Sequence, residues 1–342
     1  LRSVTVDEAN PALITVDGVL FTRDMKIMYL FPTLLARGED GKEMKFEEYM
    51  VPEGVEEIYA YFKATKLKRV ILPNTLKKLG NNVLSCNTLT QVNLPESLEY
   101  LGRGCLSGTT IQSELHIPEN VNYVGDYCFE DSDFTKINIP KNITCIEDGT
   151  FANTRHLETV ELHEGITKVG AYAFEESHIQ SLDLPDGLAS LDYYVFCKSD
   201  IVQIKLGHGI ESIDRAFPGC KNLRDIYSPK TTPPDIDPDD PLGLKEVRHS
   251  RKITVHVPEG CKLAYESTPW KRVGTIVQDL TNSVEEIGDE NAILDNELCD
   301  AYTISGAHVA SSLKYSDMRA NLSKGLYIIR TTSGKTAKMA VE

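Results

Sequence analysis

Apolar and polar residues alternate in short segments that return along most of the chain. Each segment has the form V-x-L followed by a fixed position, occupied by proline in VILP, VNLP and LDLP. This alternation predicts a short, half-buried β-strand, which proline ends because it cannot donate to a β-ladder. Successive fixed positions lie 21 to 23 residues apart, at Pro52, Pro73, Pro95, Pro118, Pro140, His163, Pro185, Gly207 and Pro229.

Each repeat continues with a second apolar pattern. Aliphatic residues follow the fixed position by three and by six residues, as Val121 and Val124 follow Pro118, and a glycine or an acidic residue often comes next. A large apolar residue stands about eleven positions after the fixed one. Because equivalent residues stack in successive turns, these large residues predict an internal spine. Its members are Leu84, Leu106, Phe129, Phe151, Phe174, Phe196 and Phe217.

A fixed period of this size predicts a repeat solenoid, in which each turn buries its apolar side against its neighbours. The predicted fold is mainly β, with short helical or irregular turns. The repeat pattern stops near residue 282. Beyond it, residues 283–342 contain short alternating segments separated by Ser-Gly and Lys-Gly turns, which predicts a small C-terminal β-sandwich.

Several segments carry a family resemblance. IPENVNYVGDYCFEDSDFTKINIP and LHEGITKVGAYAFEESHIQSLDLP resemble the BspA-type leucine-rich repeats of bacterial surface proteins. VTVDEANPALITVDGVLFTRDMKIMYLFP is similar to the hairpin-bearing variant, with LRSVTVD as a repeat strand and Asp7 at its fixed position. ITVHVPEGCKLAYESTPWKR is similar to the family's capping repeat, with Trp270 closing the open end. The resemblance implies an N-terminal repeat with a β-hairpin insertion at 1–50 and a solenoid at 51–282, capped at about 252–280.

The C-terminal segment resembles the sorting domains of type IX secretion in Bacteroidetes. Residues 283–342 would form this sorting-like domain, and Glu342 departs from it by replacing the customary basic residue. The resemblance implies an exported protein. The matching residues are Tyr302, Gly306, Val309, Lys324, Gly325, Tyr327, Ile328, Arg330, Gly334, Lys335 and Lys338.

The net charge of the chain limits the classes of partner that it can bind. The chain has 36 basic and 51 acidic residues and a net charge of −15. Binding to a phosphate backbone needs a basic face, so we expect no nucleic-acid partner, and an anionic membrane surface is disfavoured for the same reason. No apolar run reaches the roughly 20 residues of a spanning helix, so no transmembrane segment is expected.

The eight cysteines fall mainly in the repeat columns and read as buried core residues. Cys105 and Cys128 occupy one column in neighbouring turns, about 5 Å apart, which leaves a disulfide between them open. No C-x-x-C pair indicates a zinc or redox site.

The sequence contains no motif of an enzyme or of a cofactor site: G-x-S-x-G, H-E-x-x-H and a phosphate-binding glycine loop are all missing. The best metal candidate is the acidic loop DIDPDDPLGLKE. Asp240 stands where a calcium loop has glycine, so a solvated loop is the alternative reading. The four candidate ligands, at the first, third, fifth and twelfth places, are Asp235, Asp237, Asp239 and Glu246.

The outward residue of each strand does not repeat. Stacked outward residues form the extended surfaces that solenoids use for binding, although they also fit a solvated wall. A second row lies in the segments after each fixed position. The candidate binding residues are Asn93, His116, Asn138, Glu161, Asp183, Lys205 and Tyr227, with Tyr100 and Tyr123 from the second row.

The family resemblance implies a non-catalytic protein, secreted or on the outer cell surface, that mediates protein-protein or cell adhesion through its exposed sheet face. Its partner would be a protein or glycan of a host or bacterial surface. Two alternatives stay open. The chain could be a structural spacer that displays an upstream domain, or a glycan-binding protein.

Overall fold

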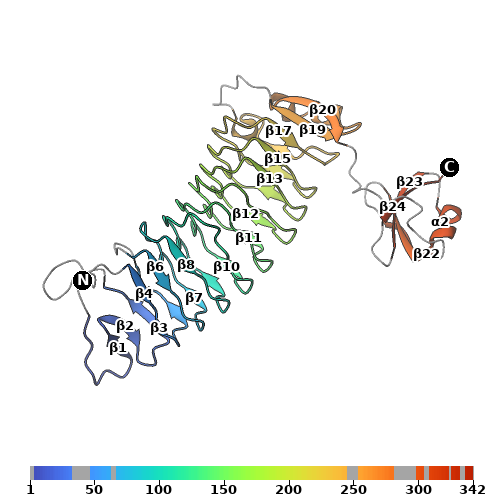
Figure 1. The fold of residues 1–342 in the computed structure, drawn as a ribbon. Helices are drawn as coiled ribbons and strands as arrows, with labels where there is room; N and C mark the ends of the chain where they lie inside the picture. The colour runs from blue at the N-terminus through green and yellow to red at the C-terminus, as the bar shows by residue number, and fades with distance from the viewer. Residues whose placement is uncertain are drawn as a thin grey trace. The chain divides into compact units, whose positions relative to one another are not determined.

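The computed structural model describes residues 4–32, 47–62, 67–244, 253–280, 298–303, 308–322, 325–331 and 336–341. The chain divides into two compact units, Leu1–Leu280 and Thr281–Glu342. The larger unit is a row of stacked, mainly β turns, which confirms the predicted solenoid (Figure 1).

The V-x-L segments form one side of the solenoid, which we call the first side. Its strands pair in parallel, and isolated bridges at Leu115–Ile137 and Lys136–Thr159 continue the row between its two sheets. Several strands end two residues before their proline, as at Pro73, Pro95 and Pro185. The strands are β4 (Glu48–Met50), β6 (Arg69–Ile71), β8 (Gln91–Asn93), β13 (Ser181–Asp183), β15 (Gln203–Lys205), β17 (Asp225–Tyr227), β19 (Thr254–Pro258) and β20 (Thr275–Leu280).

The segments after each fixed position form the second side. These strands are shorter, and each places one aliphatic residue in the core, such as Leu101 or Val124. They also run in parallel from β3 onward. The strands are β3 (Ile27–Leu30), β5 (Glu57–Ile58), β7 (Lys78–Leu79), β9 (Tyr100–Leu101), β10 (Tyr123–Val124), β11 (Cys145–Ile146), β12 (Lys168–Val169), β14 (Ser190–Leu191), β16 (Ser212–Ile213) and β18 (Asp235–Ile236).

An antiparallel hairpin begins the second side. β1 (Leu13–Val16) pairs with β2 (Val19–Thr22), and β2 pairs with β3. Because β3 then pairs in parallel with β5, the hairpin joins the solenoid sheet directly. The prediction of a repeat strand at LRSVTVD is wrong for residues 4–7, the part of this segment that the structure describes, because they form no strand. Asp7 instead accepts hydrogen bonds from the backbone of Ala9 and Asn10, which makes a turn.

The predicted spine is the centre of the core. Five phenylalanine rings stack along it with centroids 5.2–5.6 Å apart, and all five are fully buried. One turn of parallel sheet advances the chain by about 4.8 Å, so the spacing of the column matches the stacking distance of aromatic rings. The rings belong to Phe129, Phe151, Phe174, Phe196 and Phe217.

Two corners of most turns have a left-handed backbone. Asp131, Asn153, Glu176 and Lys198 lie at one corner with φ values of 49° to 56°, and the other corner contains both glycine and tyrosine. Gly104 and Gly149 have φ values of 58° and 60°, which glycine adopts without strain. Tyr127, Tyr172 and Tyr194 occupy the same column with φ values of 53°, 59° and 58°. A residue with a Cβ loses about 1–2 kcal/mol in this conformation, so these tyrosines are held at a local cost.

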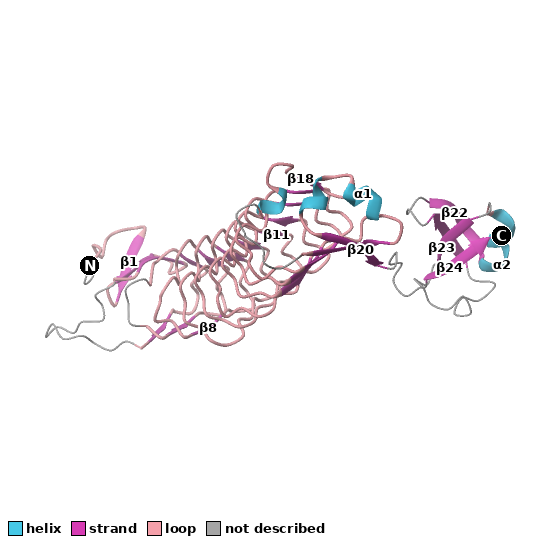
Figure 2. Cartoon of the chain, turned by 90° about the horizontal axis from the view of Figure 1, so that it is seen from above, coloured by secondary structure: helices cyan, strands magenta, loops and turns pink. Residues whose placement is uncertain are grey.

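The C-terminal end of the solenoid is closed by a cap. Helix α1 (Lys262–Glu266) and the 3-10 helix η2 (Pro269–Arg272) connect β19 to β20, while η1 (Pro241–Gly243) lies after β18. Figure 2 shows these helices gathered at this end. Trp270 is fully buried, donates from Nε1 to the Pro234 carbonyl at 2.8 Å and packs edge-on against Tyr265. The ring therefore covers the last turn.

The smaller unit contains a four-stranded antiparallel sheet in the order β22-β21-β23-β24 and helix α2 (Tyr315–Asn321). Met318 of α2 packs with Cys299, Ala301, Tyr327 and Ile329 in a small core. The predicted C-terminal β region is thus present. Among the described residues, helix α2 packs on the sheet in the place where a sandwich would have its second sheet. The strands are β21 (Leu298–Thr303), β22 (His308–Lys314), β23 (Gly325–Thr331) and β24 (Thr336–Val341).

Candidate binding surfaces

The outward residues of the first side follow one another from turn to turn, and strand pairing aligns those from Asp183 onward. The strand register aligns Asp183 with Lys205, Lys205 with Tyr227, and Tyr227 with His256. Asp183 and Lys205 are exposed, and their charged atoms lie 3.8 Å apart. We call the column Asn93, His116, Glu161, Asp183, Lys205, Tyr227 and His256 the ladder face.

An aromatic pair lies near the end of the column, before Val277 of β20. The rings of Tyr227 and His256 stack with centroids 4.3 Å apart and planes 12° apart. His256 lies between two carboxylates, with Nε2 at 3.2 Å from Asp225 and Nδ1 at 2.7 Å from Asp279. These contacts fix the imidazole ring, which in turn holds the Tyr227 ring in one orientation.

The earlier candidates of the column differ in their surroundings. Asn93, His116 and Glu161 are exposed. Asn138 is half-buried, and its amide group donates to the Ile117 carbonyl and accepts from the Ile117 nitrogen. Its side chain thus replaces a missing stretch of β-ladder, so Asn138 lies in the column but is occupied by a structural role.

Tyr100 and Tyr123 lie on the second side, away from the ladder face. Their rings stack at 4.7 Å and 15°, and Lys78 Nζ lies 4.8 Å from the centre of the Tyr100 ring. Tyr29 and Tyr59 also stack, at 6.3 Å. The sequence-predicted candidates therefore belong to two different surfaces.

The candidate calcium ligands of the acidic loop do not form a cluster, and one of them accepts hydrogen bonds from the backbone of the loop itself. Asp235 is an outward residue of β18, and the Asp237 carboxylate accepts from the backbone nitrogens of Asp239 and Asp240. Glu246 lies outside the described residues. Across the described chain, no group of three or more His, Cys, Asp or Glu residues could hold a metal ion. The calcium loop stays a prediction.

All eight cysteines are free thiols. Burial raises the pKa of Cys105 and of Cys220 to about 12, and it also raises the pKa of Cys128. A thiol whose pKa lies this high is a poor nucleophile at neutral pH. The cysteines that the sequence assigns to the core therefore act there as apolar residues.

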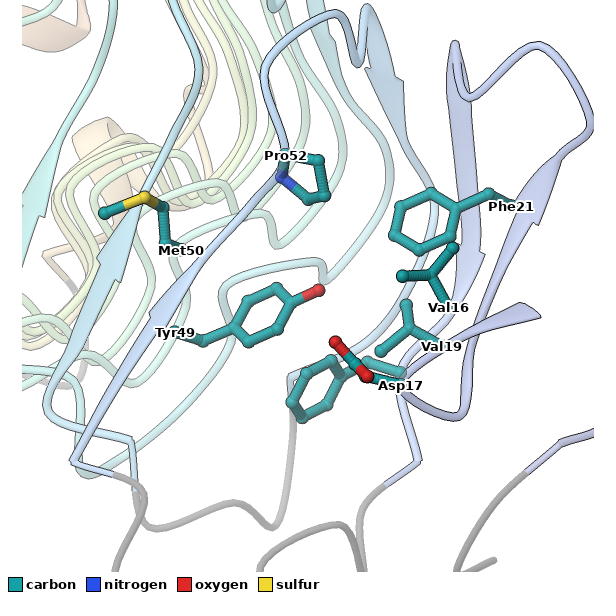
Figure 3. Close-up of a pocket in the computed structure, with 8 residues that line it drawn as sticks. Val16, Asp17, Val19, Phe21, Tyr49, Met50 and Pro52 are labelled. Carbon is teal, nitrogen blue, oxygen red and sulfur yellow. The ribbon is translucent and has the colours of Figure 1, made fainter. Parts of the chain in front are cut away.

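A cavity of about 370 Å³ lies at the N-terminal end of the solenoid (Figure 3). The β1–β2 hairpin forms one wall and β4 forms the other. Burial raises the pKa of Tyr49 to about 12, and the charge of Asp17 contributes, so the phenol stays protonated at neutral pH. The sequence gives no signal for this cavity because the residues of its two walls are about 30 positions apart. Its lining consists of Val16, Asp17, Val19, Phe21, Phe31, Tyr49, Met50 and Pro52.

The sequence of the chain matches a known family of repeat proteins. The model of the family described as "BspA type Leucine rich repeat region (6 copies)" matches residues 42–133 and 122–234, which is more than half of the chain. The chain belongs to the BspA type leucine-rich repeat family. Its family repeats supply the scaffold of both sides, whereas the cavity lining at Val16–Phe31 precedes the matched residues.

Several solved structures are similar to parts of this BspA type protein. A leucine-rich repeat protein from Bacteroides ovatus is 20% identical, with a TM-score of 0.45, over 65% of this chain and 71% of that one. One from Eubacterium ventriosum is 15% identical, with a TM-score of 0.42, over 78% and 83%. A leucine-rich cell surface protein from Faecalibacterium prausnitzii is 16% identical, with a TM-score of 0.31, over 80% and 96%. No curated protein matches the chain.

The described part of this BspA type protein contains no helix that is both long enough and apolar enough to cross a membrane.

Proposed function

We propose that this leucine-rich repeat protein is a non-catalytic binding protein, displayed outside the cell, that holds a protein partner on its ladder face. The register of Asp183, Lys205 and Tyr227 carries the proposal. Successive turns present an anion, a cation and an aromatic ring on the outside, while the buried residues of the same strands repeat as aliphatic side chains. The core therefore does not dictate this chemistry.

The ladder face has the properties of a binding surface. Tyr227 is half-buried and held by His256, so it loses little side-chain freedom when a partner covers it. Tyrosine is also enriched among the residues that dominate interface energies. The exposed pair of Asp183 and Lys205 contributes little to stability, so both charges can pair with a partner instead.

The proposal predicts binding to at least one member of a panel of extracellular-matrix proteins at micromolar concentration. Replacing Tyr227 with alanine should weaken that binding about tenfold or more, as expected for an aromatic anchor. Surface plasmon resonance with the intact chain measures both. Leu263→Ala changes an exposed apolar residue of the cap and is the matched control.

Two outcomes would count against this function. Binding of glycans alone, in a parallel glycan array, would favour the glycan-binding alternative. The absence of any ligand at micromolar concentration would favour a structural spacer.

Export rests on the resemblance of the C-terminal unit to type IX sorting domains. The four-stranded sheet with α2 forms a separate unit, as a removable signal would require. We expect that deleting residues 281–342 from the full-length gene keeps the protein inside a type IX-competent cell. Protease treatment of intact cells measures surface exposure, and unchanged digestion of the deletion variant would contradict the assignment.

A further inference from the structure

A column of tyrosines occupies a corner position that suits glycine. Tyr127, Tyr172 and Tyr194 have positive φ values, and Gly149 stands between the first two. Their backbone nitrogens donate to the following turns, at Asp148, Tyr193 and Arg215, which places the tyrosines in one column. Bulky residues rarely adopt this conformation, and strain of this kind is concentrated at functional sites. The fold itself does not require these rings.

Three of the rings contact one another, and the fourth, Tyr127, lies two turns before Tyr172 in the same column. Tyr172 stacks on Tyr194 with centroids 5.7 Å apart and planes 24° apart, and Tyr193 meets Tyr172 edge-on at 6.0 Å. The Tyr127 ring lies over Gly149, where an added Cβ would overlap it. We call Tyr127, Tyr172, Tyr193 and Tyr194 the tyrosine strip.

Both ends of the strip already hold a cation from the chain. The Arg103 guanidinium lies 5.2 Å from the centre of the Tyr127 ring. The Arg215 guanidinium lies 5.1 Å from the centre of the Tyr193 ring. These distances are those of cation–π contacts, so the rings of the strip are placed to attract positive charge.

Two carboxylates without an ion-pair partner accompany the strip. Glu130 and Glu175 follow Tyr127 and Tyr172 by three residues, and both are half-buried. Hydrogen bonds between turns place Ala152 between them in one column. Burial raises the pKa of both carboxyl groups, and the charges of Arg103 and Lys198 offset this rise only in part. Among the described residues, neither forms an ion pair, whereas the adjacent Glu176 pairs with Arg155 and Lys198.

We propose that the tyrosine strip, together with Glu130 and Glu175, binds a basic segment of a protein partner. Lysine or arginine side chains of that segment lie against the ring faces and pair with the two carboxylates. The charge favours this occupant, because partly desolvated carboxylates gain from an added cation and the chain has a net charge of −15. The strip lies at a corner of the turns, outside the ladder column, so this inference is independent of the proposed function.

The length of the strip sets the length of the probe. From Tyr127 to Tyr194 the chain makes three turns, or about 14 Å at the spacing of parallel strands. An extended peptide covers this distance with about five residues. A fluorescent (Lys-Ser)4 peptide therefore spans the strip, and (Glu-Ser)4 and maltohexaose serve as acidic and neutral probes.

The experiment measures binding of the three probes to the intact chain at low salt. The double variant Tyr172→Asn and Tyr194→Asn removes two rings but keeps a residue that tolerates positive φ. We expect (Lys-Ser)4 to bind the wild type and to bind this variant at least tenfold more weakly, with no fall in the thermal midpoint. Tyr61→Asn, at an exposed tyrosine outside the strip, is the matched control and should bind like the wild type.

A second variant separates recognition from folding. Glu130→Gln with Glu175→Gln should also weaken (Lys-Ser)4 binding, while Glu158→Gln, at an exposed glutamate, should not. If the asparagine variant unfolds, the glutamine pair decides. The proposal is overturned if (Lys-Ser)4 does not bind the wild type, or binds both altered proteins as tightly as the controls. It is also overturned if the acidic peptide or maltohexaose is the probe whose binding depends on the tyrosines.

Discussion

Replacing Phe174 with alanine is expected to lower the free energy of unfolding of the solenoid by about 3–5 kcal/mol. Phe174 is fully buried and stacks on Phe151 at 5.3 Å and on Phe196 at 5.5 Å. Alanine leaves a cavity between two rings that are fixed by their own turns and cannot close on it. Urea unfolding followed by circular dichroism measures the loss.

The matched control for this variant is Tyr61→Ala, which removes an aromatic ring from an exposed position. We expect the control to change stability by less than about 0.5 kcal/mol. A loss below about 1 kcal/mol at Phe174 would contradict a close-packed spine, because it would mean that the neighbouring turns collapse freely into the space.

Replacing Trp270 with alanine should cost about as much, roughly 3–5 kcal/mol, at the end of the array. The ring is fully buried, packs against Tyr265 and donates to the Pro234 carbonyl. Its loss opens the last turn to water. Hydrogen exchange should show the strongest loss of protection in β17 and β19, since turns of a solenoid depend mainly on their nearest neighbours.

Trp270→Phe separates the two contributions. Phenylalanine keeps most of the apolar ring but leaves the Pro234 carbonyl without its donor, so we expect a cost of about 1–3 kcal/mol. Equal exchange rates in the wild type and in Trp270→Ala would show that the cap does not protect the array.

The fold was predictable because the core repeats. A side chain such as Phe174 stands in a column with its counterparts, and the column fixes both its burial and the spacing of the turns. The same reasoning explains the burial of the cysteines, whereas the capping role of Trp270 was implied by the family resemblance. The repeat pattern gave a wrong prediction at Asp7, where the backbone forms a local turn and not the expected end of a strand.

The candidate site was less predictable because function lies in residues that do not repeat. The sequence identified Lys205 and Tyr227 as outward, but their spacing could not show that His256 stacks on Tyr227. It could not separate the ladder face from Tyr100 on the second side. A tyrosine does not by itself indicate a positive φ, so the backbone conformation of Tyr172 could not be predicted from its residue type. The glycines at Gly104 and Gly149, in the same column, did indicate a left-handed position.

The most direct test of the account is whether the ladder face can be erased without harming the scaffold. The triple variant Asp183→Ser, Lys205→Ser and Tyr227→Ser changes three aligned outward residues and leaves every buried column intact. Thermal unfolding and binding are measured on the same preparation, against a protein that binds the wild type in the panel. We expect a cooperative transition within about 4 °C of the wild type and at least a tenfold loss of affinity. Unchanged affinity in the folded variant would contradict it.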